Sequence, residues 1–231
     1  NTVNWTSFIA GIGIGDTNIF RIDGTLNLVD DDTDYIWTVN TLDDNGDPVR
    51  HTIPLEEIHQ GCPGLDCIPS IDNPTFTSVG EAEGWLEDSE PGIGFSQGGV
   101  DRFYPFQVLV RHELVNDKFP ISETDQTLKR VLISYCPLCL TAVVFDPVVQ
   151  GVESEFGVSG LLWESNLIMY DRNTQTLWSQ VLGEAIKGPA TGIKLDIIPS
   201  DVVRYGDWKQ LHPDTKVFEM PKENSLPSSE D

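Results

Sequence analysis

The segment Val131–Asp146 constrains the fold of this chain more than any other stretch. Its sequence, VLISYCPLCLTAVVFD, places two apolar runs on either side of a Cys-Pro-Leu-Cys turn. Short apolar runs bounded by turn residues predict buried strands, so the chain should enter and leave this turn as a strand. Such a turn holds two sulfur atoms close together in an environment that is partly shielded from solvent. It suits a disulfide, a redox dithiol or half of a metal site.

The remaining pattern predicts an α+β chain that is predominantly β, with antiparallel sheets and a few short helices. Further strands are expected at 92–95, 100–104, 158–162, 166–170, 184–187 and 194–198, and short helices at 54–58, 76–86 and 201–211. In the last helix, Val202, Val203, Trp208 and Leu211 should face inward. Asn116-Asp117 should begin a turn.

The composition along the chain predicts three regions. Residues 1–53 form a β-rich N-terminal region that begins with a flexible or partner-dependent arm, and residues 54–220 form an α+β domain. Residues 221–231 form a loose polar tail. The glycines at 11, 13 and 15 do not make a phosphate loop, because no Lys-Ser/Thr and no helix follows them.

Acidic residues dominate the charge of the chain. Its 37 Asp and Glu against 14 Lys and Arg give a net charge of −23, which excludes nucleic acid as a partner. No apolar run reaches the roughly 18 residues of a membrane span. The acidity suits solubility or a saline habitat, and the acidic turns at 30–34 and 43–48 leave calcium binding open.

An extracellular or cell-surface location is expected. The chain starts at Asn1 without an initiator Met, as a processed exported protein would, and Asn4-Trp5-Thr6 fits an N-glycosylation sequon. In an oxidising compartment, the closely spaced Cys62 and Cys67 should form a local disulfide.

Motifs between residues 84 and 215 match a known family in their order along the chain. They are Gly84–Asp88, Tyr104-Pro105, His112–Asp117, Tyr135–Cys139, Phe156–Gly160, Asn166–Arg172, Leu177–Gln180 and His212–Thr215. Residues 54–218 thus resemble the prokaryotic domain-of-unknown-function family 3179. The resemblance implies a mostly exported protein with a cysteine-containing site, and it implies no reaction. Leu140 departs from the Gly that usually follows the second cysteine, which weakens an analogy with zinc knuckles.

A transition-metal site is the first hypothesis for the chemistry. Cys136 and Cys139 would supply thiolates, with His112 and Met169 completing the ligands, and this donor set suits copper or zinc. The structural alternatives are a hydrogen-bonded core or edge histidine for His112 and a core packing role for Met169. A four-thiolate zinc site that adds Cys62 and Cys67 is also allowed by the spacing.

Two other classes of function stay open. A thiol–disulfide redox protein is disfavoured because Cys139 is followed by a strand rather than by the helix that lowers a thiol pKa in thioredoxin-like motifs. A non-catalytic structural subunit would carry Cys136 and Cys139 as a disulfide and would self-assemble through the N-terminal arm, bridged by calcium. Glu113 and Asp117 could act as acid or base groups, but no serine nucleophile accompanies them, since Ser159 is not in a nucleophile elbow.

Overall fold

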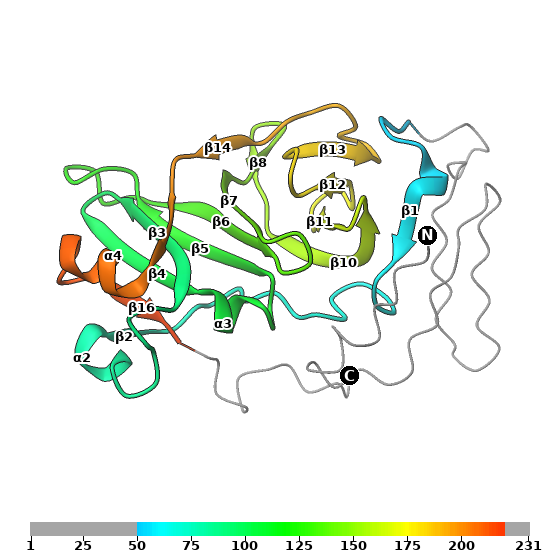
Figure 1. Cartoon of the computed structure of the whole chain (residues 1–231). Helices are drawn as coiled ribbons and strands as arrows, with labels where there is room; N and C mark the ends of the chain where they lie inside the picture. The colour runs from blue at the N-terminus through cyan, green and yellow to red at the C-terminus, as the bar shows by residue number, and fades with distance from the viewer. Residues whose placement is uncertain (1–49, 220–231) are drawn as a thin grey trace, which may run out of the picture.

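The computed structural model describes residues 50–219 of the chain (Figure 1). In chain order the elements are η1 (Leu55–Glu57), β1 (Ile58–Gln60), β2 (Phe76–Ser78), α2 (Val79–Ala82), β3 (Pro91–Gln97), β4 (Val100–Pro105), α3 (Phe106–Leu109), β5 (Leu114–Pro120), β6 (Leu128–Cys136), β7 (Thr141–Asp146), β8 (Val148–Val149), β9 (Val152–Glu153), β10 (Phe156–Trp163), β11 (Asn166–Asp171), β12 (Leu177–Ser179), β13 (Glu184–Lys187), β14 (Asp196–Ile198), β15 (Asp201–Arg204), α4 (Tyr205–Leu211) and β16 (Lys216–Phe218). The predicted class, predominantly β with antiparallel sheets and short helices, is confirmed.

Three sheets carry the fold, and the one that contains the Cys-Pro-Leu-Cys turn lies between the other two (Figure 1). The middle sheet has the order β14-β7-β6-β5 and is antiparallel. One outer sheet has the order β1-β10-β11-β12-β13, and the other has the order β15-β3-β4-β16-β2. The β4–β16 pair is parallel, whereas the other strand pairs are antiparallel.

Strand β6 is buried on both faces because its side chains alternate between two cores. Val131, Ile133 and Tyr135 pack into one core with side chains of β3 and β4. Leu132 and Cys136 pack into the other core with side chains of β10, β11 and β12. A continuous apolar run is what a strand buried on both faces requires, so the strands predicted around the turn are confirmed.

The prediction of a helix over 201–211 is wrong in its first turn. Residues 201–204 form β15, which pairs with β3 from Gly94 to Pro91, and only Tyr205–Leu211 is helical. Of the side chains expected to face inward, Trp208 is buried, whereas Val202 and Leu211 are exposed. The β-branched pair Val202-Val203 joins an available strand edge, and this tertiary pairing outweighs the helical spacing of the apolar residues.

Two other local predictions also need correction. In the helix expected over 76–86, residues 76–78 are strand β2, and the helix is limited to Val79–Ala82 behind the capping box of Ser78 and Glu81. Asn116 and Asp117 do not begin a turn, because they lie within β5 and pair with Leu132 and Val131. Their side chains form specific buried contacts that a turn would not provide.

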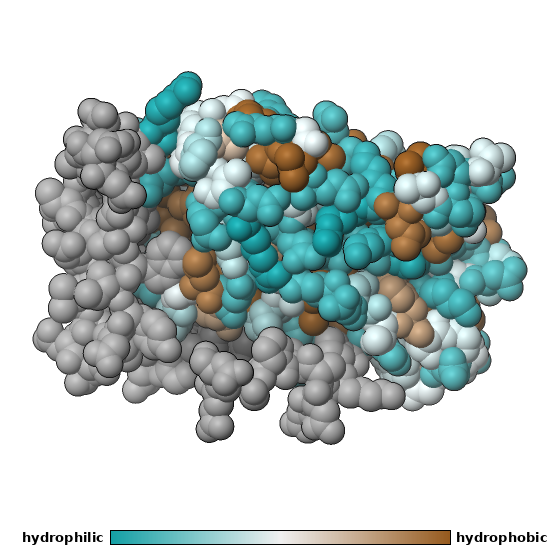
Figure 2. Space-filling view, turned by 180° about the vertical axis from the view of Figure 1, so that it is seen from behind, coloured by the Kyte–Doolittle hydropathy of each residue, from teal (hydrophilic) through white to brown (hydrophobic). Residues whose placement is uncertain are grey.

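Several predictions concern residues outside the described range. The N-terminal arm, most of the strands expected before residue 50, both acidic turns and the 221–231 tail lie there. Within residues 50–219, no helix is long and apolar enough to cross a membrane. The face of the described residues seen in Figure 2 is mostly hydrophilic, with small separate hydrophobic patches.

Candidate functional site

The Cys-Pro-Leu-Cys turn closes the hairpin between β6 and β7. Cys136 and Thr141 form the last residue pair of the ladder, so the turn spans residues 137–140. Leu140 adopts a φ of 56°, the left-handed conformation that favours glycine, and its side chain is 71% exposed. The turn therefore keeps the geometry that a glycine would supply, although the chain has leucine at this position.

The two cysteines of the turn are free thiols in different surroundings. Cys136 is buried, whereas Cys139 is exposed. Burial, followed by the hydrogen bond with Cys139, raises the pKa of the Cys136 thiol. Burial also opposes ionisation of Cys139, but hydrogen bonds from Thr141, Asn166 and Cys136 outweigh it and lower the pKa of the Cys139 thiol. Cys139 is therefore the cysteine that ionises first, and it is also the one that solvent reaches.

A network of amide and hydroxyl groups surrounds the sulfur of Cys139. Asn166 Nδ2 donates to Cys139 Sγ at 3.2 Å, and Thr141 Oγ1 lies 2.7 Å from the same sulfur. Gln180 Oε1 accepts from Asn166 Nδ2 at 2.8 Å, and its Nε2 donates to Ser134 Oγ at 3.1 Å. We call Cys136, Cys139, Thr141, Asn166 and Gln180 the thiol site.

Separate strands hold the thiol site in place. Asn166 begins β11, and its Oδ1 accepts a hydrogen bond from Val181 N at 3.0 Å. Gln180 directly follows β12 and is fully buried. Because both amides are buried and hydrogen-bonded on more than one side, they present fixed donors and acceptors to the hairpin turn. The predicted strand 166–170 and the residue that follows β12 thus provide the two amides of the thiol site.

Glu113 is a buried carboxyl group beside this site. It is 8% exposed, and its φ of 59° is left-handed. Burial, followed by the charge of Cys139, raises the pKa of Glu113 to about 8. The carboxyl group is therefore mostly protonated at neutral pH.

His112 and Met169, the other members of the predicted ligand set, have defined surroundings in the structure, and Met169 belongs to the same core cluster as Cys136. His112 is buried in the connection between α3 and β5, and its Nδ1 lies 2.9 Å from Pro69 O. Met169 is fully buried in β11 among core side chains. Among residues 50–219, no group of three or more His, Cys, Asp and Glu side chains is placed to hold a metal ion. A copper or zinc site at this turn would need a further ligand.

The predicted Cys62–Cys67 disulfide is confirmed. It consumes two of the thiolates that the four-cysteine zinc site would need, so that alternative is wrong. Cys62 N donates to Gly160 O at 3.1 Å, which attaches the disulfide loop to β10. Gly160 has a φ of 77°, and a Cβ there would approach Cys62 O to 2.7 Å, so only glycine fits.

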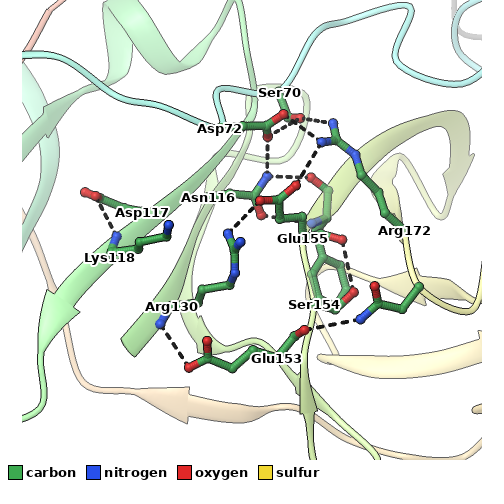
Figure 3. Close-up of polar contacts among 12 residues, drawn as sticks. Ser70, Asp72, Asn116, Asp117, Lys118, Arg130, Glu153, Ser154, Glu155 and Arg172 are labelled. Carbon is green, nitrogen blue, oxygen red and sulfur yellow. Dashed lines mark hydrogen bonds and ion pairs between the residues drawn. The ribbon is translucent and has the colours of Figure 1, made fainter. Parts of the chain in front are cut away.

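A second polar group fixes the segment after this loop to the sheets, and we call it the Arg172 cluster (Figure 3). Its members are Ser70, Asp72, Asn116, Glu155 and Arg172. Arg172 donates to Asp72 Oδ2 at 2.6 Å and to Ser70 Oγ at 2.9 Å. Asn116 donates to Phe156 O at 2.8 Å and accepts from Phe156 N at 2.8 Å. Every charged member has a partner of opposite charge, so the cluster joins β5, β10 and β11 and offers no free reactive group.

Comparison with known proteins gives one match. The family model described as "Protein of unknown function (DUF3179)" matches residues 65–227. The chain belongs to this family. The resemblance proposed from the sequence motifs at 54–218 is thereby confirmed, with a match that starts later and ends later. No curated protein and no solved structure shows a significant match to the chain.

Sequence reasoning found both cysteines of the thiol site but missed the side chains around them. Asn166, Thr141 and Gln180 received no role, although two of them stand in the family motifs. The available signal was a polar amide at the border of an apolar strand, where burial requires hydrogen-bond partners. Ser159, in contrast, donates to Ile168 O at 2.6 Å inside β10, consistent with the rejection of a serine hydrolase.

Proposed function

We propose that the thiol site carries out thiol–disulfide exchange, with Cys139 as the attacking thiolate and Cys136 as the second cysteine. One observation carries this proposal. The exposed sulfur of Cys139 is hydrogen-bonded to Asn166 and Thr141, and a buried thiol, Cys136, stands three residues before it in the turn. The sequence disfavours redox chemistry because no helix begins after the turn. Side-chain donors replace the helix dipole as the stabilising group for the thiolate.

The exchange proceeds in two balanced steps. The Cys139 thiolate attacks one sulfur of a substrate disulfide, forms a mixed disulfide and releases the other substrate sulfur as a thiolate. Cys136 then loses its proton and attacks Cys139 Sγ, which releases the second substrate thiolate and leaves a Cys136–Cys139 disulfide. The substrate disulfide gains two electrons, and the dithiol loses two. In the reverse direction, the same steps oxidise a substrate dithiol.

The test uses the full chain and an aromatic disulfide, 5,5′-dithiobis(2-nitrobenzoate), as the probe. Cys139 should react first, and wild type should then release a second equivalent of thionitrobenzoate as the Cys136–Cys139 disulfide closes. Cys136→Ser should stop after one equivalent and keep a stable mixed disulfide, detected by mass spectrometry. A wild-type chain whose two thiols react independently, each retaining a probe molecule, would overturn the proposal.

The copper or zinc site remains the competing proposal, supported by the same pair of sulfurs. Elemental analysis of protein purified without chelators separates the two. Stoichiometric copper or zinc that blocks both thiols until a chelator is added would favour the metal site. Metal-free protein with one rapidly reacting thiol would favour the exchange proposal.

We infer an extracellular or cell-surface location for this activity. The Cys62–Cys67 disulfide supports it, because such bonds persist in oxidising compartments. The calcium-bridged assembly subunit remains a further proposal, but it relies on residues 1–49. Size measurements with and without calcium test it, since only an assembly would change its mass when calcium is removed.

A further inference from the structure

An exposed leucine stands beside the sulfur that the exchange proposal assigns as the attacking group. Leu140 directly follows Cys139, is 71% exposed and has a φ of 56°. Leaving a large apolar side chain in water and holding a left-handed backbone both cost free energy, and glycine at this position would avoid both costs. The hairpin therefore presents an apolar side chain to solvent where its own folding gains little from it.

A second segment brings two further exposed apolar residues to the same place. Val181 and Leu182 lie in the turn between β12 and β13, and they are 44% and 45% exposed. Asn166 connects this turn to the thiol, because its Oδ1 accepts from Val181 N at 3.0 Å while its Nδ2 donates to Cys139 Sγ at 3.2 Å. One amide side chain therefore separates the backbone of this turn from the exposed sulfur.

Leu140 is tied to the same turn by its neighbour in the chain. Gln180 Nε2 donates to Thr141 O at 3.3 Å, and Gln180 Oε1 accepts from Thr141 Oγ1 at 3.1 Å. Thr141 directly follows Leu140, and Gln180 directly precedes Val181, so these two hydrogen bonds hold the two apolar segments next to each other. We call Leu140, Val181 and Leu182 the apolar rim of the thiol site.

An exposed acid lies on another side of the dithiol. Glu164 is exposed in the turn between β10 and β11, and Cys136 Sγ donates to the carbonyl of the next residue, Ser165, at 3.8 Å. The nearby cation Lys194 is already paired with Glu184 at 3.2 Å. Together with the net charge of −23 on the whole chain, these charges disfavour the approach of an anionic disulfide.

We propose that the apolar rim binds the substrate of Cys139 and that this substrate is a polypeptide disulfide, an inference that rests on the exchange function proposed above. In this substrate, apolar side chains flank the attacked cysteine and acidic side chains are absent. The rim contacts the apolar side chains while the Cys139 thiolate attacks one substrate sulfur, and the other substrate sulfur leaves as a thiolate.

Two properties of the rim favour a polypeptide over a small hydrophilic disulfide. A small hydrophilic disulfide has no apolar groups that could remove the rim from water, and one that carries carboxylates would also be repelled by Glu164. A peptide carries side chains on both sides of its cysteine. The rim offers one apolar segment in the turn of Cys139 and a second across the Asn166 amide, which suits such a pair of side chains.

The test uses the full chain with Cys136→Ser, so that only the attack by Cys139 is measured. The probes are three peptides, acetyl-X-Cys-X-amide with Leu, Ser or Glu as X, each supplied as its symmetric disulfide. Mass spectrometry of quenched samples gives the rate of mixed-disulfide formation, and division by the rate with 2-mercaptoethanol removes the intrinsic reactivity of each probe. The leucine probe should react about tenfold faster than the serine probe, and the glutamate probe should react more slowly than both.

Leu140→Asn in this background tests the rim directly, because asparagine tolerates the left-handed backbone and removes the apolar side chain. It should lower the preference for the leucine probe over the serine probe at least about threefold. Leu211→Asn, the same change at an exposed leucine at the end of α4, should change this preference by less than about 1.5-fold. The preference is a ratio within one chain, so any change in Cys139 ionisation cancels. Equal preferences with and without Leu140→Asn, or equal losses in both variants, would overturn the inference.

Two further measurements separate this inference from its alternatives. Glu164→Gln should raise the rate of the glutamate probe about twofold at low salt and leave the serine probe unchanged. A wild-type chain that dimerises through Leu140, measured by sedimentation, would show that the rim binds a second copy and would overturn the inference. Closure of the Cys136–Cys139 disulfide without any preference among the probes would overturn the rim alone, whereas a preference without closure would overturn the exchange function.

Discussion

The Arg172 cluster and the thiol site are both networks of polar side chains at the contacts between sheets. They differ in whether their ionisable groups have partners of opposite charge. In the Arg172 cluster, Arg172 is paired with Asp72 and Glu155, and the Asn116 amide is bonded to both backbone groups of Phe156. In the thiol site, the hydrogen bonds converge on an exposed sulfur, and no cation among residues 50–219 forms an ion pair with the neighbouring Glu113. The polar groups of the first network hold segments of the chain together. The second network leaves two ionisable groups, Cys139 and Glu113, that can change charge.

This difference predicts that substitutions in the two networks affect different quantities. Those in the Arg172 cluster should lower the free energy of unfolding and leave the Cys139 thiol unchanged. Those in the thiol site should change ionisation and reactivity with smaller losses of stability.

The largest effect is expected for Asn116→Ala. It removes three hydrogen bonds and leaves the buried Phe156 N–H without a partner, at a cost of about 3–4 kcal/mol in unfolding free energy. Urea denaturation measures this loss. Asn173→Ala, at an exposed amide bonded to Glu153 O, should cost less than about 0.5 kcal/mol. Equal losses in the two variants would contradict the anchoring role of Asn116.

Glu113→Gln should stabilise the protein at alkaline pH. Burial, then the charge of Cys139, raises the pKa of Glu113 from 4.5 to about 8 in the folded chain, so between these values the unfolded chain ionises the carboxyl while the folded chain does not. Wild-type stability attributable to this group is therefore complete below pH 4.5 and declines as the pH rises toward 8. The variant should match wild type near pH 4 and exceed it near pH 8 by on the order of 3 kcal/mol.

Urea denaturation at both pH values tests this expectation, with Glu164→Gln as the control. The exposed carboxyl of Glu164 should give little dependence on pH. A Glu113→Gln variant that is no more stable than wild type near pH 8 would show that the carboxyl ionises there without cost.

Thr141→Val should raise the pKa of Cys139 by roughly one unit, because it removes a hydroxyl that lies 2.7 Å from the sulfur and keeps the side-chain shape. The rate of alkylation by iodoacetamide near pH 7 should fall about five- to tenfold. Thr174→Val is the matched control, since its hydroxyl bonds to Asp171 Oδ2 at 2.7 Å and not to either thiol. A comparable fall in the control would refute the specific role of Thr141.

The smallest effect is expected for Leu140→Gly. The leucine side chain is exposed and its φ is 56°, so glycine should relieve backbone strain and add roughly 0.5–1 kcal/mol of stability. The alkylation rate of Cys139 should stay within about twofold of wild type, because the hydrogen bonds to the sulfur are unaffected. Destabilisation would mean that the exposed leucine makes contacts that offset the strain.

Strands β6 and β7 of the middle sheet could be predicted because they are encoded locally. The β-branched runs around the Cys-Pro-Leu-Cys turn fit only a buried hairpin, and the turn residues mark where it closes. The β15 segment could not be predicted in this way. Its valines have the spacing of a helix as well as the shape preferred in strands, and the free edge of β3 decides between the two.

The sequence by itself determined the position of the dithiol, the Cys62–Cys67 disulfide and the membership of the family. Each depends on residues that are close in the chain or on an ordered series of motifs. Only the tertiary structure decided which cysteine is exposed and which side chains surround it, because Asn166 donates to Cys139 from another sheet and is itself bonded to Gln180. It also decided that the His112 ring contacts Pro69 O, a residue distant in the chain. The ionisation of a thiol depends on such contacts between distant residues, and local spacing does not encode them.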